Sequence, residues 1–342
     1  MIDGRETSMP HYLILVTPSA NRVFAGQAAA LSATELEICA GPAARVSRVE
    51  SLAGVDYIGF DTDDYAAVSA VVARLSSAYA IFETVGELLR PVELMKTDRF
   101  TDDLVTIPKY QGKTNEQFTR MLVNITAASM TRRPSEAITL LDPLAGRGTT
   151  LSVGLTLGYD VAGVESDVKA VEAYAAFLKT YLRRKRLKHK ASIDPVRREG
   201  RSLGRRLQLD VTPEGGGRQQ QLTVFTGDTR QSAALLGKRK FDLVVADAPY
   251  GVVHGAADRG DHGRRDRSPA ALLADALPVW AGQLKHGGAL GISWNTYGLT
   301  REELTAIAEA AGLEPLDDGP YLQLSHRVDA SIFRDVFIAR KP

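Results

Sequence analysis

Two short segments contain the residues whose types and spacing point most directly to chemistry. The first is Asp142–Thr150, in which Gly146 and Gly148 follow an apolar run. The second is Asp247–Gly251, which also follows an apolar run and opens a loop. Glycines between a strand and a helix permit a tight turn and let a ligand approach the backbone. A carboxylate beside a proline and an aromatic residue can hold and orient a planar amine.

Acidic residues end three successive predicted strands. Asp142 precedes the glycine loop, Glu165 ends the next strand and Asp228 follows the third. At the edge of a doubly wound sheet, Glu165 can accept hydrogen bonds from ribose hydroxyls and Asp228 can accept one from an adenine amine. Each residue has a structural alternative, since Asp142 can cap a turn, Glu165 can be an exposed strand end and Asp228 can cap a helix. The set favours a nucleotide-like cofactor. Leu151 stands where the dinucleotide fingerprint has its third glycine, which disfavours nicotinamide or flavin.

The second segment predicts a catalytic loop made of Asp247, Ala248, Pro249 and Tyr250. An exocyclic amine on a nucleobase is a poor nucleophile because its lone pair is delocalised into the ring. The Asp247 carboxylate and the Ala248 carbonyl would accept hydrogen bonds from the two amine protons. Pro249 would stiffen the turn, and Tyr250 would stack on the base. The alternative is a β-turn that closes a buried strand, because Asp, Pro and Gly are all turn residues.

Length and composition predict a globular chain with two domains. It has 342 residues, 44% of them apolar, and its apolar stretches are too short to span a bilayer. The start of the chain lacks signal-peptide features, and the single cysteine, Cys39, excludes a disulfide framework and a cysteine-rich zinc site. We therefore expect a cytoplasmic protein. Residues 1–110 hold 9 basic and 15 acidic residues, whereas the rest hold 33 and 26, so phosphate binding is expected in the C-terminal part.

The N-terminal part predicts a small α+β domain with a ferredoxin-like β-α-β-β-α-β order. Strands are expected at 12–16, 46–51, 56–60 and 79–83, with helices at 25–39 and 64–75. The domain should cover residues 1–88. A polar stretch over residues 89–112 predicts a linker.

Residues 113–342 alternate between helical and strand patterns, which predicts a mostly parallel, doubly wound α/β sheet. Strands are expected at 137–141, 161–164, 222–226, 243–246 and 289–293. Helices are expected from residue 115, through 153–157, and at 168–182, 270–284 and 301–311. Residues 321–324 and 331–339 predict a terminal antiparallel hairpin.

A basic segment, residues 183–206, breaks this alternation. It holds eleven lysines and arginines, two acidic residues and few apolar ones. We interpret it as an insertion or mobile arm that neutralises phosphates, with a solvated loop as the alternative. Its candidate nucleic-acid contacts are Arg183, Arg184, Lys185 and Arg186.

A glycine-rich stretch at 254–267 is interpreted as a lid over the target base, with Arg264 and Arg265 near phosphate. Its histidines and aspartates do not predict a metal site, because ligands on a flexible loop lack preorganisation. We expect no metal.

Residues 113–342, without the basic segment, resemble the tRNA guanine-N2 methyltransferase family. The likeness rests on the glycine loop followed by Asp247-Ala248-Pro249-Tyr250, which is similar to the Asp-Pro-Pro-Tyr loop of amino-methyltransferases, with Ala248 in place of a proline. It implies a seven-stranded Rossmann-like sheet and S-adenosylmethionine as cofactor. It places that cofactor on Asp142, Leu144, Gly146, Gly148, Thr149, Glu165 and Asp228, with Lys113 and Thr114 near its methionine part.

The function expected from this resemblance is N-methylation of a nucleobase amine, in RNA before DNA, with guanine N2 of tRNA or rRNA as the target. DNA adenine or cytosine methylation is the first alternative. Protein glutamine methylation uses a similar loop that usually begins with Asn, which Asp247 disfavours. A nucleic-acid-binding module without turnover is the remaining alternative. The N-terminal part is short and acidic, whereas family members often add a basic RNA-binding unit there.

Overall fold

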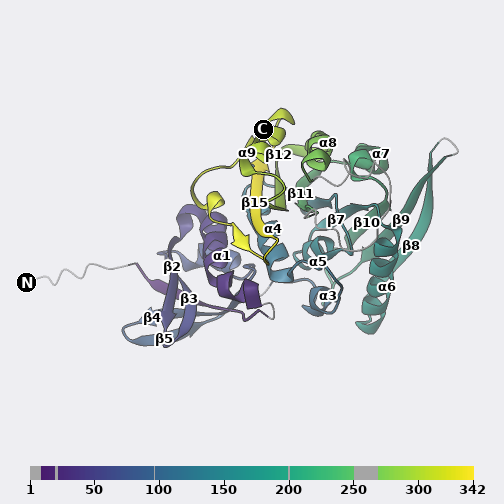
Figure 1. The fold of residues 1–342 in the computed structure, drawn as a ribbon. Helices are drawn as coiled ribbons and strands as arrows, with labels where there is room; N and C mark the ends of the chain where they lie inside the picture. The colour runs from purple at the N-terminus through teal and green to yellow at the C-terminus, as the bar shows by residue number, and fades with distance from the viewer. Residues whose placement is uncertain (1–8, 20–21, 96, 199–200, 250–268) are drawn as a thin grey trace, which may run out of the picture. The chain divides into compact units, whose positions relative to one another are not determined.

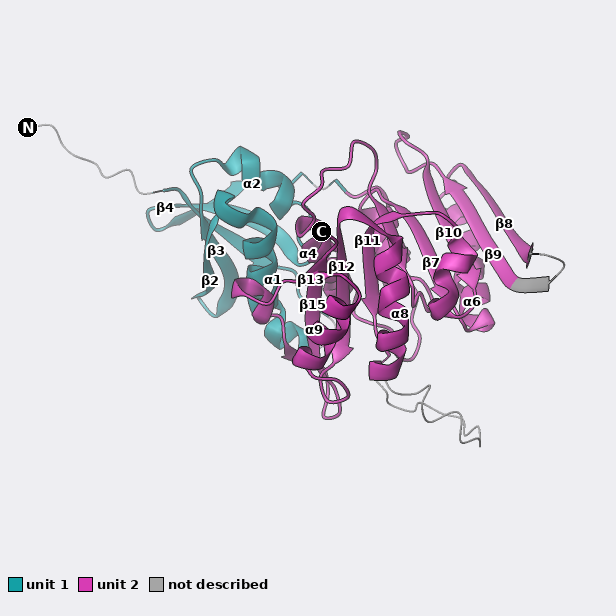
Figure 2. Cartoon of the chain, turned by 90° about the horizontal axis from the view of Figure 1, so that it is seen from above, with its two compact units in different colours: residues 1–97 teal, residues 98–342 magenta. Residues whose placement is uncertain are grey.

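The computed structural model describes residues 9–19, 22–95, 97–198, 201–249 and 269–342. The chain divides into two compact units, residues 1–97 and 98–342 (Figure 2). Each unit has its own sheet and its own buried core, and each is described below by itself.

The first unit is an antiparallel sheet of order β2-β3-β1-β4-β5 with two helices. Its elements are β1 (His11–Val16), α1 (Arg22–Ala40), β2 (Arg45–Leu52), β3 (Val55–Asp61), α2 (Tyr65–Val72), β4 (Ala78–Val85) and β5 (Leu88–Val92). Both helices pack on the same apolar core, in which Leu36 and Val68 meet Ile14 and Phe60 from the strands. The β-α-β-β-α-β order is therefore confirmed, with β5 added at the edge. The predicted linker is not uniformly irregular, since it includes most of β5 and the short helix α3 (Asp103–Thr106).

The second unit is built on a ten-stranded sheet whose main path runs β13-β15-β12-β11-β6-β7-β10-β9-β8. Figure 1 shows this sheet with its helices. Five strands in its middle are parallel: β6 (Thr139–Asp142), β7 (Asp160–Glu165), β10 (Gln220–Thr226), β11 (Phe241–Asp247) and β12 (Leu284–Asn295). From β6 the chain adds β7 and β10 on one side, then returns to add β11 and β12 on the other. The predicted doubly wound topology is therefore confirmed.

Two groups of helices cover this sheet. The first holds α4 (Glu116–Ala128), α5 (Thr149–Thr156) and α6 (Val168–Arg184). The second holds α7 (Ser232–Leu236), α8 (Pro269–Gln283) and α9 (Arg301–Ala310), which contact one another in sequence. Trp280 from α8 and Trp294 from β12 are fully buried in the core beneath the second group. The resulting rigid scaffold holds the carboxyl ends of the parallel strands in place.

The predicted seven strands are too few. Antiparallel strands flank both sides of the parallel set: β15 (Phe333–Arg340) with β13 (Glu314–Pro315) and β14 (His326–Arg327) on one side, β9 (Arg201–Val211) and β8 (His189–Arg198) on the other. The terminal hairpin is β14 with β15. Residues Gly319–Leu322 form a 3₁₀ helix instead of the predicted strand, because Pro320 at its start cannot donate to a sheet ladder.

The basic segment is neither a loop nor a separate arm along most of its length. Strands β8 and β9 form a hairpin that adds to the sheet beside β10. Leu207, Leu209 and Val211 are buried on one face, whereas the residues between them are partly exposed. This period of two residues is typical of a strand with one buried face, and the arginines at other positions conceal it.

Candidate functional site

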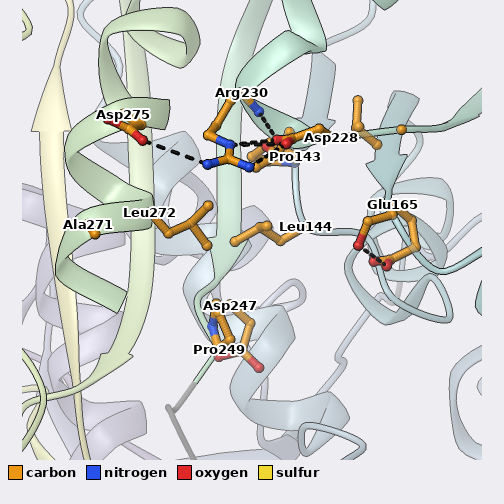
Figure 3. Close-up of a pocket in the computed structure, with 14 residues that line it drawn as sticks. Pro143, Leu144, Glu165, Asp228, Arg230, Asp247, Pro249, Ala271, Leu272 and Asp275 are labelled. Atoms are coloured by element: carbon orange, nitrogen blue, oxygen red, sulfur yellow. Dashed lines mark hydrogen bonds and ion pairs between the residues drawn. The ribbon is translucent and has the colours of Figure 1, made fainter. Parts of the chain in front are cut away.

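A cavity of about 710 Å³ lies at the carboxyl edge of the parallel strands (Figure 3). Parallel strands end at one edge, and a crevice forms where the strand order reverses. The cavity is lined by Pro143, Leu144, Val164, Glu165, Ser166, Gly227, Asp228, Thr229, Arg230, Asp247, Pro249, Ala271, Leu272 and Asp275. The structure therefore brings five predicted site residues together at one cavity: Leu144, Glu165, Asp228, Asp247 and Pro249.

Glu165, at the end of β7, is held by the glycine loop. Its Oε2 accepts a hydrogen bond from the Gly146 N–H at 2.7 Å, and its Oε1 accepts one from the Asp167 N–H at 2.7 Å. Gly146 has φ +51°, a conformation that favours glycine. Oε1 also accepts a hydrogen bond from the Ser166 hydroxyl at 3.3 Å, whereas Oε2 keeps a second lone pair for a ligand in the cavity.

Gly148 starts helix α5 with φ +80° and supports the loop by its small size. A Cβ at this position would overlap the ring of Tyr174, a residue of α6 that is 3% exposed. Its neighbour Thr149 hydrogen-bonds Tyr110, with 2.8 Å between the two hydroxyl oxygens. Neither Gly148 nor Thr149 lines the cavity, so the structure gives both a role in shaping the loop.

Asp142 lies beneath the cavity instead of on its wall. It is 2% exposed, and its Oδ1 accepts a hydrogen bond from the Leu144 N–H at 3.0 Å. Burial raises the pKa of this carboxyl to about 7, against the opposing effect of its hydrogen bonds, and the nearby Glu165 and Asp247 raise it further. Asp142 therefore caps the turn, which was the structural alternative for this residue, and it also lies next to the cavity.

Asp228 lines the cavity and also caps the 3₁₀ helix that follows it. Its Oδ1 accepts a hydrogen bond from the Arg230 N–H at 2.8 Å, and the Arg230 guanidinium lies 2.6 Å from Oδ2. This guanidinium holds the pKa of Asp228 below its usual value. Asp275 of α8 lies 3.8 Å from the same guanidinium (Figure 3). The sequence analysis missed Arg230, although its position two residues after a strand-end acid marks it as a local partner.

Asp247 ends β11 and receives hydrogen bonds on both carboxylate oxygens. Thr114 Oγ1 donates to Oδ2, and Ser293 Oγ donates to Oδ1. Ser293 is the register partner of Asp247 on the parallel strand β12 and is fully buried. A serine inside a buried apolar strand was the available signal for this residue, which the sequence analysis did not identify. Thr114 thus contacts the candidate catalytic carboxylate, and its predicted place near the cofactor stays a prediction.

Ala248 and Pro249 continue from Asp247. Ala248 is 1% exposed, and its N–H donates to the Ser293 carbonyl at 2.8 Å, so its side chain packs in the core. Pro249 lines the cavity. Tyr250 lies outside the described residues, as do Arg264, Arg265 and the stretch 254–267.

Lys113 does not line the cavity. Its Nζ donates to the Val105 carbonyl at 2.6 Å and lies 3.1 Å from a Glu116 carboxylate oxygen. These contacts hold the segment before α4, and the predicted contact of Lys113 with the methionine part of the cofactor stays a prediction.

The four predicted nucleic-acid contacts that the structure describes lie at the end of helix α6 and directly after it. Helix α6 starts after the carboxyl end of β7 and runs back for 17 residues, about 25 Å at 1.5 Å per residue. Arg183 and Arg184 at its end lie near the opposite edge from the cavity, and Lys185 and Arg186 follow them. Lys185 is also paired with Asp103 at 2.9 Å. The nucleic-acid contacts of these four residues, which rest on the basic composition of residues 183–206, stay a prediction.

Two further findings concern the described residues. Among them no group of three or more His, Cys, Asp or Glu side chains is arranged to hold a metal ion. The described helices also include none that is long and apolar enough to cross a membrane.

No protein-family model matches this chain, and no curated protein matches its sequence. In three dimensions the chain is similar to TrmN from Thermus thermophilus, with 17% identity and a TM-score of 0.41 over 88% of this chain and 60% of that one. It is similar to the 16S rRNA N2 methyltransferase RsmC of the same organism, solved with AdoMet and guanosine, with 16% identity and a TM-score of 0.37 over 87% and 58%. It is also similar to the pre-rRNA processing protein fibrillarin from Methanococcus jannaschii, with 14% identity and a TM-score of 0.38 over 76% and 93%.

Proposed function

We propose that this chain is an S-adenosylmethionine-dependent methyltransferase that acts on an exocyclic amine of a nucleobase, with guanine N2 in tRNA or rRNA as the leading target. One observation carries the proposal. Of four consecutive neighbours in the parallel sheet, three end in an acidic residue and β10 is followed by one two residues later. Three of these acids, Glu165, Asp228 and Asp247, line one cavity. The fourth, Asp142, lies next to them in the core.

The cavity fits the chemical groups of S-adenosylmethionine. Glu165 presents a carboxylate for the ribose hydroxyls, and Asp228 presents one for the adenine amine. Leu144 and Leu272 supply apolar walls for a planar ring. When bound, the cofactor supplies a methyl group on a positively charged sulfur, and an acidic cavity favours a cation.

Asp247 is suited to hold the amine that receives the methyl group. An Oδ atom of Asp247 accepts a hydrogen bond from one amine N–H, and the Ala248 carbonyl is proposed to accept the other. This arrangement aims the nitrogen lone pair and stabilises the positive charge that develops on the amine. Thr114 and Ser293 limit the rotation of the carboxylate, since each donates to a different oxygen.

We propose RNA as the substrate because its unpaired bases expose their amines. An amine inside a duplex is reached only after the base is flipped out, which costs unpairing energy, whereas RNA loops present bases that are already unstacked. Methylation of adenine or cytosine in DNA, and not of RNA, would contradict this part of the proposal.

Calorimetric titration of S-adenosylmethionine into the full chain tests the cofactor site. Glu165→Gln and Asp228→Asn keep the size of each side chain and remove its charge, so each should weaken binding by about tenfold, the loss expected for a charge-assisted hydrogen bond. Glu309→Gln is the matched control, because Glu309 is exposed near the end of α9 and does not line the cavity. No binding by the wild-type chain, or equal effects of all three variants, would refute the cofactor site.

A further inference from the structure

The described end of the basic hairpin, at the pair Arg198 and Arg201, lies at the same edge of the sheet as the cavity. Strand β10 runs parallel to β7, and its last residue, Thr226, pairs with Glu165. Strand β9 is antiparallel to β10, with Arg206 opposite Phe225 and Val211 opposite Gln220. Strands β8 and β9 therefore continue past the carboxyl edge of the sheet as far as the pair Arg198 and Arg201. At about 3.3 Å per residue, the four residues from 205 back to 201 reach about 13 Å beyond that edge.

Two contacts join the base of this projection to Thr226, which lies close to the wall of the cavity. The Arg205 N–H donates to Thr226 Oγ1 at 2.7 Å. Gly204 approaches the same residue so closely that a Cβ would overlap the Thr226 carbonyl oxygen. Thr226 is two residues before Asp228, which lines the cavity. On β8, Val196 packs against the apolar core beneath helices α7, α8 and α9. The hairpin is thus joined to the site by packing and backbone contacts.

The sequence of this projection is strongly basic. Residues 197–206 contain five arginines and one glutamate, and we call the described residues among them, 197–198 and 201–206, the hairpin end. Arg197 is exposed. Arg205 pairs with Glu172 at 2.7 Å, but both side chains are about half exposed, at 46% and 51%. Such surface pairs contribute little to stability, so a phosphate can take the place of Glu172. Guanidinium groups bind phosphate oxygens through two parallel hydrogen bonds.

We infer that the hairpin end binds the phosphates of an RNA strand next to the nucleotide in the cavity. The inference rests on the proposed function. It assigns substrate binding to Arg197, Arg205 and Arg206 and removes it from Arg183 and Arg184, which lie near the other edge of the sheet. Both sets of arginines come from the same basic segment, so the sequence alone does not separate them.

The test compares two pairs of substitutions that remove the same charge. Arg205→Ser with Arg206→Ser alters the hairpin end, and Arg183→Ser with Arg184→Ser alters the end of α6. Binding of an unmodified tRNA transcript, a ribosomal RNA fragment and duplex DNA is measured by fluorescence anisotropy over a range of salt concentrations. Arg197→Ser, an exposed single substitution, is measured as well, so that the result does not depend on the folding of one variant.

The first pair should raise the Kd for RNA by about tenfold or more and lower the slope of log K against log salt by about 1.4, the value for two phosphate contacts on a single strand. Arg197→Ser should weaken binding in the same direction, and the α6 pair should change it by less than about twofold. The inference is overturned if both pairs of substitutions weaken RNA binding equally, or if neither weakens it. It is also overturned if the wild-type chain does not bind RNA, or binds duplex DNA more tightly. Calorimetry with S-adenosylmethionine separates the two proposals. If the wild-type chain binds the cofactor but one of these contrary results is found, the hairpin inference fails and the proposed cofactor site stands.

Discussion

Thr114 donates a hydrogen bond to Asp247 although 133 residues separate them in the sequence. Thr114 precedes helix α4, and Asp247 ends β11 in the middle of the sheet. The contact brings the start of the unit onto the candidate catalytic carboxylate. It points to a positioning role for Thr114, in addition to the cofactor contact that the sequence predicts.

Removing this hydroxyl should lower turnover and leave cofactor use unchanged. Thr114→Val keeps the shape of the side chain and deletes one hydrogen bond, so we expect kcat to fall about tenfold, equivalent to about 1.4 kcal/mol. The KM for S-adenosylmethionine should stay constant. Steady-state kinetics separate the two quantities, and Thr106→Val, an exposed substitution on α3, is the control. A raised KM for the cofactor with unchanged kcat would restore the original interpretation of Thr114.

The two glycines of the cofactor loop should differ in their tolerance of a side chain. Gly148→Ala adds a methyl group that overlaps Tyr174 and also occupies φ +80°, so we expect a loss of about 3 kcal/mol in the free energy of unfolding. Gly146→Ala has no atom within 4 Å of the new methyl group and incurs only the backbone cost at φ +51°, about 1 kcal/mol. Urea denaturation of both variants measures the difference. Similar losses would show that Tyr174 does not restrict position 148.

Asp142 should make the stability of the protein depend on pH. Burial raises its pKa in the folded chain to about 7, whereas an unfolded aspartate titrates near 3.8. Between these values the folded state binds more protons than the unfolded state, so the free energy of unfolding falls as pH rises from about 4 to about 7. A shift of this size corresponds to at most about 4 kcal/mol at pH 8.

Asp142→Asn keeps the acceptor for the Leu144 N–H and cannot ionise. The variant should therefore be more stable than wild type at pH 8 and similar to it at pH 4, as measured by denaturant unfolding across that range. The difference between the two curves isolates Asp142, because all other groups are shared. A constant difference at every pH would show that folding leaves the pKa of Asp142 unchanged and would contradict the prediction.

The strand-end acids could be predicted from the sequence because each follows a short apolar run. In a parallel sheet such residues must meet at one edge, which explains why Glu165, Asp228 and Asp247 line one cavity. Ser293 could not be placed in the same way. Its contact with Asp247 depends on the register between β11 and β12, and register is a property of the folded sheet.

The basic hairpin was concealed for a different reason. Its alternating pattern is short on β9 and interrupted by Pro195 on β8, and arginines fill many of the exposed positions. Composition therefore indicated a loop where packing of Leu207 and Leu209 makes a strand. The direction of β9 follows only from its antiparallel pairing with β10. This direction decides at which edge of the sheet the arginines lie.

Methyl transfer is the central claim of the proposed function, and one assay tests it directly. The purified chain receives S-adenosylmethionine with a labelled methyl group and, separately, unmodified tRNA, ribosomal RNA and DNA, with Asp247→Ala as the control. Nucleoside mass spectrometry then identifies the product. We predict label in RNA as N2-methylguanosine, abolished in the Asp247→Ala variant. Label in DNA alone would contradict RNA as the substrate, and no label in any nucleic acid would contradict nucleobase methylation itself.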